Sequence, residues 1–299
     1  MLIHLFGSTN PSGEAFIRNV EKEFKDIKLI KYSRNIKSYN YLDFKNYKSF
    51  KPKGGDEPCL WINFGPIWLF AEFLNNLYEN KKELTQNIKG ILTCSSSSIL
   101  TKRFANNDFD KQLVKKLQNS ERQICLISKN LGIKLTVIRP TMIYGQVGNY
   151  KDQNISKLIQ IMRILPIIAL PQRTGLRQPI HANQLANIFI NYVINFDKEL
   201  NSNIKIELVE VGGNSIISYE KMLTLIQDKL PNYDKGKNCF FLKIPNRIFY
   251  LLAAPSLIFS PKLYESIMRI SADLSGFKKS SAYEFDNSKE DFPVLPLSN

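Results

Sequence analysis

Four consecutive serines, Ser95 to Ser98, are the most chemically suggestive run in the sequence, because they directly follow the apolar segment IKGILTC. A β-strand that ends at Cys94 would deliver these hydroxyl groups to one edge of a sheet. There they could bond a ligand hydroxyl or carbonyl group. The alternative is a serine-rich turn that caps the helix after it.

A second polar turn lies at the start of the chain, between the apolar run that ends at Phe6 and a segment with helical spacing. Pro11 suits the first helical turn, and a helix that opens from such a turn presents amide groups to a pyrophosphate. Asn10 stands at the middle glycine position of the dinucleotide-binding fingerprint, and Asn tolerates the left-handed conformation. The spacing predicts a phosphate-binding turn, with a plain strand-to-helix turn as the alternative. Its residues are Gly7, Ser8, Thr9, Asn10 and Gly13.

The next expected strand, IKLIKYS, ends at Ser33 and is followed by Arg34. A chain that binds NAD usually carries Asp or Glu here, to bond the ribose hydroxyls. Arg34 could instead pair with a 2′-phosphate, so the sequence favours NADP over NAD as the cofactor. The alternative for Arg34 is a solvent-facing position.

Strand and helix patterns alternate along the elements that must position these groups. CLWIN predicts a strand, Gly65-Pro66 a break, and the apolar run after it a helix. Phe109 to Leu131 predicts a long helix that Gly132 ends, and the strand KLTVIRP stops at Pro140. The order indicates an α/β fold, a doubly wound parallel sheet with a smaller C-terminal cap.

The C-terminal part is apolar and interrupted by prolines. The run from Ile248 to Phe259 is too short to cross a bilayer, and we expect it to form a buried helix of the cap. The alternative is a helix that lies on a membrane surface beside Arg247 and Lys262. From Phe277 onward the sequence predicts a polar, irregular tail.

Composition narrows the class of protein. Lys and Arg outnumber Asp and Glu by 41 to 27, a net charge of +14. The basic residues are scattered without the aromatic interleaving of nucleic-acid binders, so we expect no nucleic-acid partner. No apolar run is long enough for an integral membrane segment. The four cysteines lack metal-ligand spacing, which favours no metal site and a reducing cytoplasmic location.

The segments IRPTMIYG and GLRQPIHANQLA resemble the extended short-chain dehydrogenase/reductase superfamily, in its NAD-dependent epimerase/dehydratase branch. The resemblance implies a Rossmann domain formed by residues 1–145 and 181–211. It also implies a substrate-binding cap formed by residues 146–180 and 212–299. A nucleotide sugar would be the substrate, and a homodimer is possible.

The resemblance also implies roles for single residues. Ser97 is the first candidate for the catalytic hydroxyl and Ser96 the second. Asp43 would lie beside the adenine, and the break at Gly65 and Pro66 beside the nicotinamide ribose. Two further residues would hold the diphosphate of the substrate, because a guanidinium fork matches two phosphate oxygens and an amide can donate beside it; they are Asn154 and Arg177.

Hydride-transferring members of this superfamily carry a Tyr and a Lys four residues apart, since an ammonium group lowers the pKa of the phenol toward neutrality. With Glu121 as the glutamate after that pair, the two positions hold Leu113 and Leu117, and no tyrosine lies between residues 78 and 144. A similar pattern with Thr-Lys after the serines occurs in a subgroup found among bacterial surface-polysaccharide genes. Lys102 is then the candidate proton-handling group, whereas Glu121 is expected to form a structural ion pair.

These observations lead to two hypotheses. The first is an NAD(P)-dependent sugar-nucleotide epimerase, dehydratase or reductase of surface-polysaccharide biosynthesis. The second is a catalytically inactive dinucleotide-binding sensor or scaffold that kept the fold and lost the proton relay. His181 is expected to pack onto the sheet in either case.

Overall fold

The computed structural model describes residues 1–34, 40–196, 205–283 and 290–297. Its centre is an eight-stranded sheet. In chain order its strands are β1 (Leu2–Phe6), β2 (Lys28–Ser33), β3 (Asn40–Tyr41), β4 (Cys59–Asn63), β5 (Ile88–Cys94), β6 (Lys134–Pro140), β13 (Ile206–Gly212) and β16 (Lys278–Lys279).

Every neighbouring pair in this sheet is parallel, and the spatial order is β16-β13-β6-β5-β4-β1-β2-β3. The chain builds outward from β1 to β3 and then returns to the other side of β1 with β4. This reversal is the switch point of a doubly wound Rossmann sheet, where ligands bind. The predicted fold class is confirmed.

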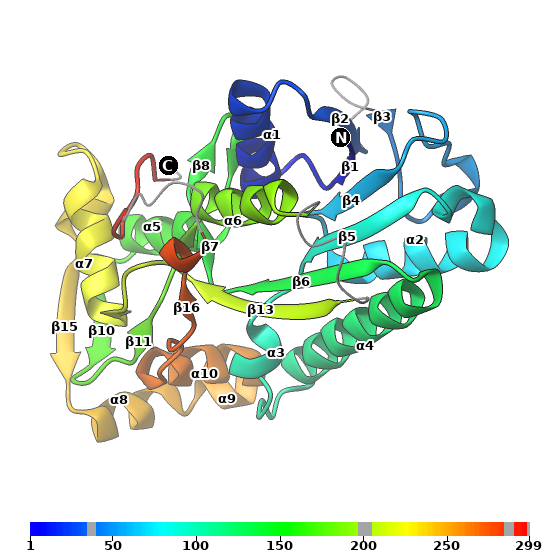
Figure 1. Ribbon diagram of the computed structural model, residues 1–299. Helices are drawn as coiled ribbons and strands as arrows, with labels where there is room; N and C mark the ends of the chain where they lie inside the picture. The colour runs from blue at the N-terminus through cyan, green and yellow to red at the C-terminus, as the bar shows by residue number, and fades with distance from the viewer. Residues whose placement is uncertain (35–39, 197–204, 284–289, 298–299) are drawn as a thin grey trace.

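Four long helices cover the two faces of the sheet (Figure 1). Their bounds are α1 (Pro11–Glu23), α2 (Ile67–Asn80), α4 (Asp108–Leu131) and α6 (Ala182–Ile194). Helices α1 and α6 pack against each other over one face, and α2 and α4 over the other.

The central strands β1 and β4 are mostly apolar because both of their faces are buried. In β4, Leu60 and Ile62 join the core under α1 and α6, whereas Trp61 joins the core under α2 and α4. Helix α4 begins and ends as the sequence predicts. The Asn107 side chain accepts a hydrogen bond from the Asp110 amide at its start, and Gly132 ends it with a φ of 69°.

The remaining elements form a smaller unit at one end of the sheet (Figure 1). Its core consists mainly of residues from α5, α7 and the strands beside them, among them Tyr144, Ile155 and Met222. Its helices are α5 (Asn154–Ile164), α7 (Tyr219–Lys229), α8 (Asn246–Ala253), α9 (Ser256–Phe259), α10 (Pro261–Met268) and the 3-10 helix η5 (Arg269–Ser271). The short helix α3 (Ser98–Thr101) packs instead on α4, and its Ile99 joins the core under α2 and α4. The short strands are β7 (Ile143–Tyr144), β8 (Gln146–Val147), β9 (Tyr150–Lys151), β10 (Ile167–Pro171), β11 (Leu176–Arg177), β12 (Ile180–His181), β14 (Ile217–Ser218) and β15 (Phe240–Ile244).

Two expectations for the C-terminal part are wrong. The tail is not wholly irregular, because β16 pairs with the end of β13 as an edge strand of the central sheet. A strand of two lysines carries no apolar pattern that would reveal it. The run from Ile248 to Phe259 is also not a buried helix, since most of its large apolar side chains in α8 and α9 are exposed, although Phe249 is buried. In the part of the chain that the structure describes, no helix is both long and apolar enough to cross a bilayer.

Candidate functional site

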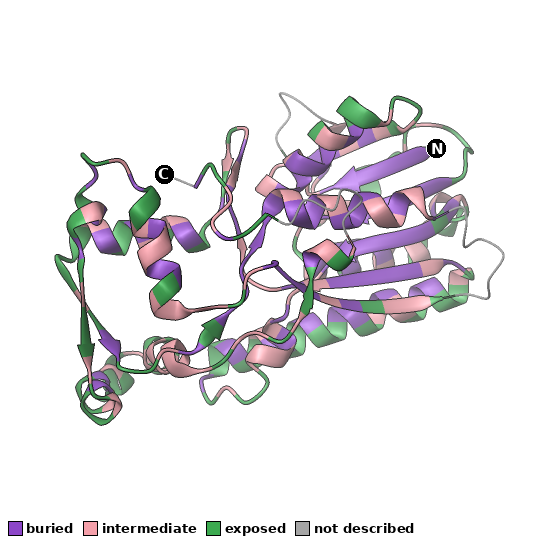
Figure 2. Ribbon diagram, turned by 60° about the vertical axis from the view of Figure 1, so that its left-hand side comes forward, coloured by how far each residue is buried: buried purple, intermediate pink, exposed green. Residues whose placement is uncertain are grey.

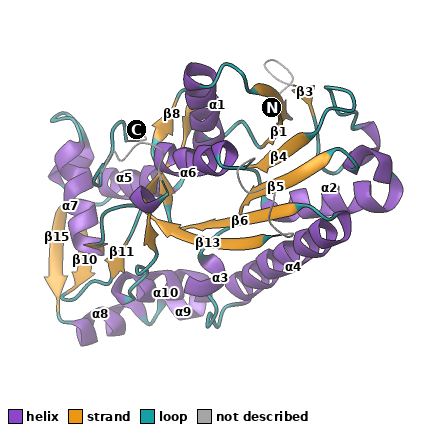
Figure 3. Cartoon of the chain, in the orientation of Figure 1, coloured by secondary structure: helices purple, strands orange, loops and turns teal. Residues whose placement is uncertain are grey.

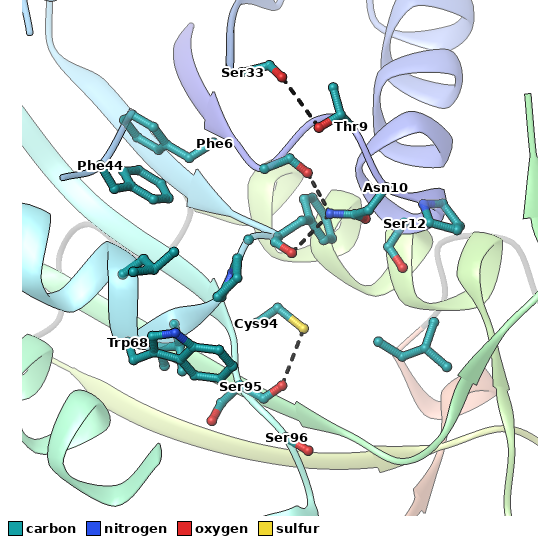
Figure 4. Close-up of a pocket in the computed structure, with 18 of the residues that line it drawn as sticks. Phe6, Thr9, Asn10, Ser12, Ser33, Phe44, Trp68, Cys94, Ser95 and Ser96 are labelled. Atoms are coloured by element: carbon teal, nitrogen blue, oxygen red, sulfur yellow. Dashed lines mark hydrogen bonds between the residues drawn. The ribbon is translucent and has the colours of Figure 1, made fainter. Parts of the chain in front are cut away.

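A cavity of about 760 Å³ opens at the carboxyl ends of β1, β4 and β5, where the order of the strands reverses. Figure 4 shows the turn after β1, with Asn10 and Ser12, on one side of this space and Cys94, Ser95 and Ser96 on the other. The volume is in the range of small-molecule and cofactor sites. Segments far apart in the sequence therefore meet at one concave site.

Gly7 and Gly65 bring the first two turns of the cavity into contact. Gly7 has a φ of 71°, and a Cβ atom built on it would lie 2.1 Å from the Gly65 amide nitrogen. Any side chain at Gly7 would push the two turns apart. Both glycines line the cavity together with Thr9, Asn10 and Pro66, as the sequence analysis expected of a cofactor site.

Asn10 supports this turn in a different way from the one expected. Its φ is −144°, so the expectation of a left-handed residue is wrong and Asn10 is an extended N-cap of α1. Its side-chain oxygen accepts a hydrogen bond from the Gly13 amide at 3.0 Å. Its side-chain nitrogen donates to the carbonyl groups of Gly7 and Phe64, at 2.6 and 3.1 Å. The asparagine thus ties the glycine turn to the loop after β4.

This cap leaves few amides at the start of α1 for an anion. Pro11 has no N–H group, and the Gly13 N–H is taken up by Asn10. Among the residues that the structure describes, the Ser12 amide has no hydrogen-bond partner, so it is the amide of this turn that an anion could bind. Ser8 and Gly13 do not line the cavity but pack behind the turn that does. The Ser8 hydroxyl donates to the Tyr32 carbonyl at 3.0 Å.

Two cations line the end of the cavity beside β2. Arg34 and Lys45 are both exposed there, with Asp43 and Phe44 between them in sequence. The Asp43 carboxylate accepts a hydrogen bond from the Lys45 amide at 3.0 Å, which fixes the loop. Positive charge therefore stands at the point where sequence analysis placed a 2′-phosphate.

The structure selects among the four serines. Ser95 and Ser96 line the cavity, but Ser97 does not. Ser97 is 7% exposed, and its amide donates to the Pro140 carbonyl at 3.0 Å. The Ser96 hydroxyl accepts a hydrogen bond from the Ser98 amide at 3.1 Å, so it also caps the turn into α3. The capping alternative thus holds for one residue of the run.

Ser95 is the residue that sequence reasoning passed over. Its hydroxyl donates to the Glu121 carboxylate at 2.5 Å. Arg139 on β6 holds the same carboxylate through two hydrogen bonds, at 3.0 and 2.5 Å, and also binds Glu210. These hydrogen bonds outweigh desolvation and raise the pKa of Arg139. Glu121 is therefore a structural ion-pair residue, as predicted, but it also orients a hydroxyl group at the cavity wall.

Leu113 and Leu117 on α4 also line the cavity. They occupy the positions that sequence analysis assigned to the missing Tyr and Lys, so the wall is apolar where a proton relay would stand. Cys94 lies nearby, and burial raises the pKa of its thiol to about 12. Such a thiol stays protonated at neutral pH and is a poor base.

Lys102 and Arg177 do not line the cavity. The Lys102 ammonium group binds the buried Asp110 carboxylate at 2.8 Å. Arg177 is buried, and its guanidinium group donates to the backbone carbonyls of Leu176, Ala272 and Arg269. Ser97, Lys102 and Arg177, to each of which the resemblance gave a role at the site, therefore all lie outside the cavity lining.

Another part of the cavity wall comes from the loop before α5 and from the first residue of that helix. Asn154 lines the cavity, and its side-chain nitrogen donates to the Ile143 carbonyl at 2.8 Å. Lys151, Asp152 and Gln153 line it as well, and the Asp152 carboxylate accepts hydrogen bonds from the first amides of α5. The sequence pointed only to Asn154 in this loop.

His181 lies behind the site and is fully buried at the start of α6. Its Nδ1 atom accepts a hydrogen bond from the Asn183 amide at 3.2 Å. Burial lowers its pKa to about 4, so the ring is neutral. It packs onto the sheet end, as expected, and does not line the cavity. Among the described residues, no group of three or more metal-binding side chains occurs.

The sheet order and the position of the cavity define a doubly wound, Rossmann-type fold with a cavity at its switch point. No protein-family model matches the sequence, and no curated protein matches it.

Solved structures with the same fold include a nucleoside-diphosphate-sugar epimerase from Staphylococcus aureus, at 14% identity and a TM-score of 0.58 over 96% of each chain. A human epimerase family protein solved with NADPH is 14% identical, with a TM-score of 0.59 over 97% of this chain and 96% of that one. A UDP-glucuronic acid 4-epimerase from Bacillus cereus, solved with NAD, is 11% identical, with a TM-score of 0.57 over 95% and 92%. At these identities the similarity establishes the fold.

Proposed function

We propose that the chain binds NADP or NAD in the cavity at the switch point of the sheet. The observation that carries this proposal is the contact between Gly7 and Gly65, which keeps both turns free of side chains where a dinucleotide must approach the backbone. Asp43 and Phe44 would flank the adenosine, and Ser12 would bond the pyrophosphate. Arg34 and Lys45 favour NADP, since a 2′-phosphate would meet two cations.

A nucleotide sugar is the proposed substrate, in an epimerase, dehydratase or reductase reaction that serves surface-polysaccharide biosynthesis. Support comes from the fold shared with sugar-nucleotide epimerases and from the polar residues that the start of α5 and the loop before it add to the cavity wall. Asn154 and Lys151 would contact the substrate there. Arg177 has no place in this proposal, because its donors are used by backbone carbonyl groups.

The residues at the reacting end suit orientation better than proton abstraction. A bound nicotinamide would supply hydride transfer. Because the Ser95 hydroxyl donates its hydrogen bond to Glu121, its oxygen can accept a hydrogen bond from a sugar hydroxyl. Arg139 holds the Glu121 carboxylate in place through two hydrogen bonds. Leu113 and Leu117 exclude water, and Ser96 offers a second hydroxyl.

A second function is favoured by the same two leucines. With apolar side chains at the positions of the Tyr-Lys pair, the chain could hold a dinucleotide without turnover, as a sensor or scaffold. The two proposals share the cofactor and differ in chemistry. Either one requires nucleotide affinity.

Isothermal titration with NADP and NAD tests the shared part. We expect saturable binding and tighter binding of NADP, and we expect Arg34→Ala to remove roughly tenfold of the NADP affinity while leaving that for NAD unchanged. Absence of heat with both nucleotides would contradict the proposal. Incubation with UDP-, GDP- and dTDP-sugars then separates the two functions. Sugar interconversion or reduction of bound NADP supports the enzyme, and binding without turnover supports the sensor.

A further inference from the structure

One face of the molecule carries large apolar side chains that the fold leaves in solvent. It is formed by α8, α9 and the start of α10, and we call it the α8–α10 face (Figures 1 and 2). Its members are Ile248, Leu251, Leu252, Leu257, Ile258, Phe259 and Leu263, which are each between 49% and 85% exposed. Single exposed apolar residues are ordinary, whereas a group this dense marks an interaction site.

Intramolecular packing does not account for this composition. Helix α8 buries only Phe249 and Ala253, and α9 and α10 bury none of their residues. Ile258 and Phe259 are 84% and 85% exposed, the extreme values of the face. Hydrophilic side chains at these positions would leave the core unchanged, so the apolar surface serves something other than folding.

The charged residues next to the apolar run in sequence are basic, whereas Glu265 on α10 and Glu220, which pairs with Lys243, are acidic residues farther away in the sequence. No charged residue occurs from Ile248 to Pro261, and the run is bounded by Arg247 and Lys262. Lys243, also basic, is the one other charged residue between positions 238 and 264. An apolar centre with a basic rim is the pattern of segments that enter the headgroup layer of anionic membranes.

The loop before α4 extends this pattern. The Lys262 ammonium group lies 3.3 Å from the centre of the Phe109 ring, and the Arg103 guanidinium 4.6 Å from that of Phe104. Phe104 is 82% exposed and Phe109 is 54% exposed. The Glu265 carboxylate on α10 fixes the loop by accepting hydrogen bonds from two of its backbone amides. Two aromatic rings, each beside a cation, therefore adjoin the apolar helices.

We propose that the α8–α10 face docks on the surface of an anionic lipid bilayer. The helices would lie in the interface, with Ile258 and Phe259 at the greatest depth and Arg247 and Lys262 at the level of the lipid phosphates. No described helix can span the bilayer, so the attachment is peripheral. This inference is independent of the proposed cofactor.

A second copy of the chain is a poorer occupant of the same face. In a two-fold dimer the same patch meets itself, so the basic rim of one copy would face the basic rim of the other. Like charges across an interface oppose association. Anionic phosphates neutralise the rim, and the formal charge of +14 adds a long-range attraction to such a surface.

Vesicle flotation tests the proposal with the full chain. The vesicles are phosphatidylcholine alone, or phosphatidylcholine mixed with phosphatidylglycerol. We expect the protein to float with the anionic vesicles, less with the neutral ones, and less as salt rises. Ile258→Asp/Phe259→Asp should reduce the bound fraction at least tenfold, because burying two charges replaces burying two apolar side chains. Arg247→Gln and Lys262→Gln should each weaken binding by roughly fivefold.

Tyr233→Asp is the matched control, since Tyr233 is 90% exposed and lies outside the face. It should float like the unaltered chain, and all variants should keep its melting temperature. If the folded chain floats with neither kind of vesicle, the proposal fails. It also fails if light scattering finds a dimer that Ile258→Asp/Phe259→Asp dissociates, because the face is then an interface between copies.

Discussion

At the scale of single residues, the cavity depends on the absence of a side chain at Gly7. The first turn and the loop after β4 touch at Gly7 and Gly65, and Asn10 holds both by its side-chain amide. Position 7 requires glycine for two reasons: its φ is positive, and the backbone of the loop after β4 lies against it. A clash with backbone cannot be relieved by a rotamer change.

Gly7→Ala separates these two requirements when it is compared with Gly55→Ala. Gly55 has a φ of +67°, close to the +71° of Gly7, but nothing lies within 4 Å of the position of its Cβ. Both variants should lose about 1 kcal/mol of unfolding free energy for the left-handed alanine. Only Gly7→Ala should lose several kcal/mol more, and with it the NADP affinity. Urea unfolding and nucleotide titration measure the two effects. Equal losses in both variants would show that the contact does not matter.

The chemistry of the serine run also depends on single residues. Ser95 faces both the cavity and Glu121, whereas Ser97, two positions later, lies at the buried start of α3. The position after Cys94 therefore matters more than the register suggested by family resemblance. Ser95 and Ser96 line the cavity, and Ser95 is the one of the two whose hydroxyl bonds the Glu121 carboxylate.

At the scale of elements, a buried ion pair joins α3, α4 and η5. Asp110 in α4 has no exposed side-chain area and binds Lys102 at 2.8 Å and Arg269 at 2.9 Å. Burial opposes its ionisation, but the hydrogen bonds from Lys102 and Asn107 and the two positive charges keep its pKa below the usual value. Lys102 is thereby placed as a link between elements.

Lys102→Met should change stability and leave ligand binding alone. Removing the ammonium group leaves Asp110 with fewer partners, so the unfolding free energy should fall by about 1–3 kcal/mol. NADP affinity should stay within twofold. Lys28→Met removes an exposed pair at 3.9 Å and should cost less than about 0.5 kcal/mol as the control. If Lys102→Met instead lost turnover or NADP affinity without losing stability, Lys102 would act at the site.

At the scale of the whole molecule, the chain's two histidines are both buried and neutral. His4 in β1 is 2% exposed and bonds the Tyr32 hydroxyl, and His181 caps α6. Burial lowers the pKa of each to about 4, against 6.5 in the unfolded chain. Between pH 4 and pH 6.5 the unfolded state therefore binds more protons than the folded state.

The sign of the pH dependence follows from this difference. Both rings contribute fully to the unfolding free energy above pH 6.5, and this contribution is lost as the pH falls toward 4. Each histidine changes the unfolding free energy by up to about 1.4 kcal/mol per pH unit in this range. Asp110, whose pKa is lowered, loses its contribution only below its unfolded value of 3.8, outside this window. His181→Asn keeps a capping side chain and should roughly halve the slope of urea-unfolding free energy against pH. An unchanged slope would mean that other groups control it.

The local elements of this protein could be predicted from the sequence. The strands that end at Cys94 and Pro140, the Gly132 cap and the Pro11 helix start are confirmed, because periodicity and backbone restrictions act within a few residues. The alternation of strands and helices also predicted the parallel sheet. The lack of a Tyr-Lys pair could also be read from the sequence, because no tyrosine occurs between residues 78 and 144.

Only the tertiary structure decided which side chains meet. Lys102 and Arg177 carry suitable chemistry, but their partners, Asp110 and the carbonyl groups of η5 and its neighbours, come from other elements of the fold. The exposure of α8 and α9 was hidden for a related reason, because an apolar run has the same sequence whether a core covers it or not. Local patterns fix the backbone, whereas the partners of long polar side chains and of apolar faces are set by packing across the whole chain.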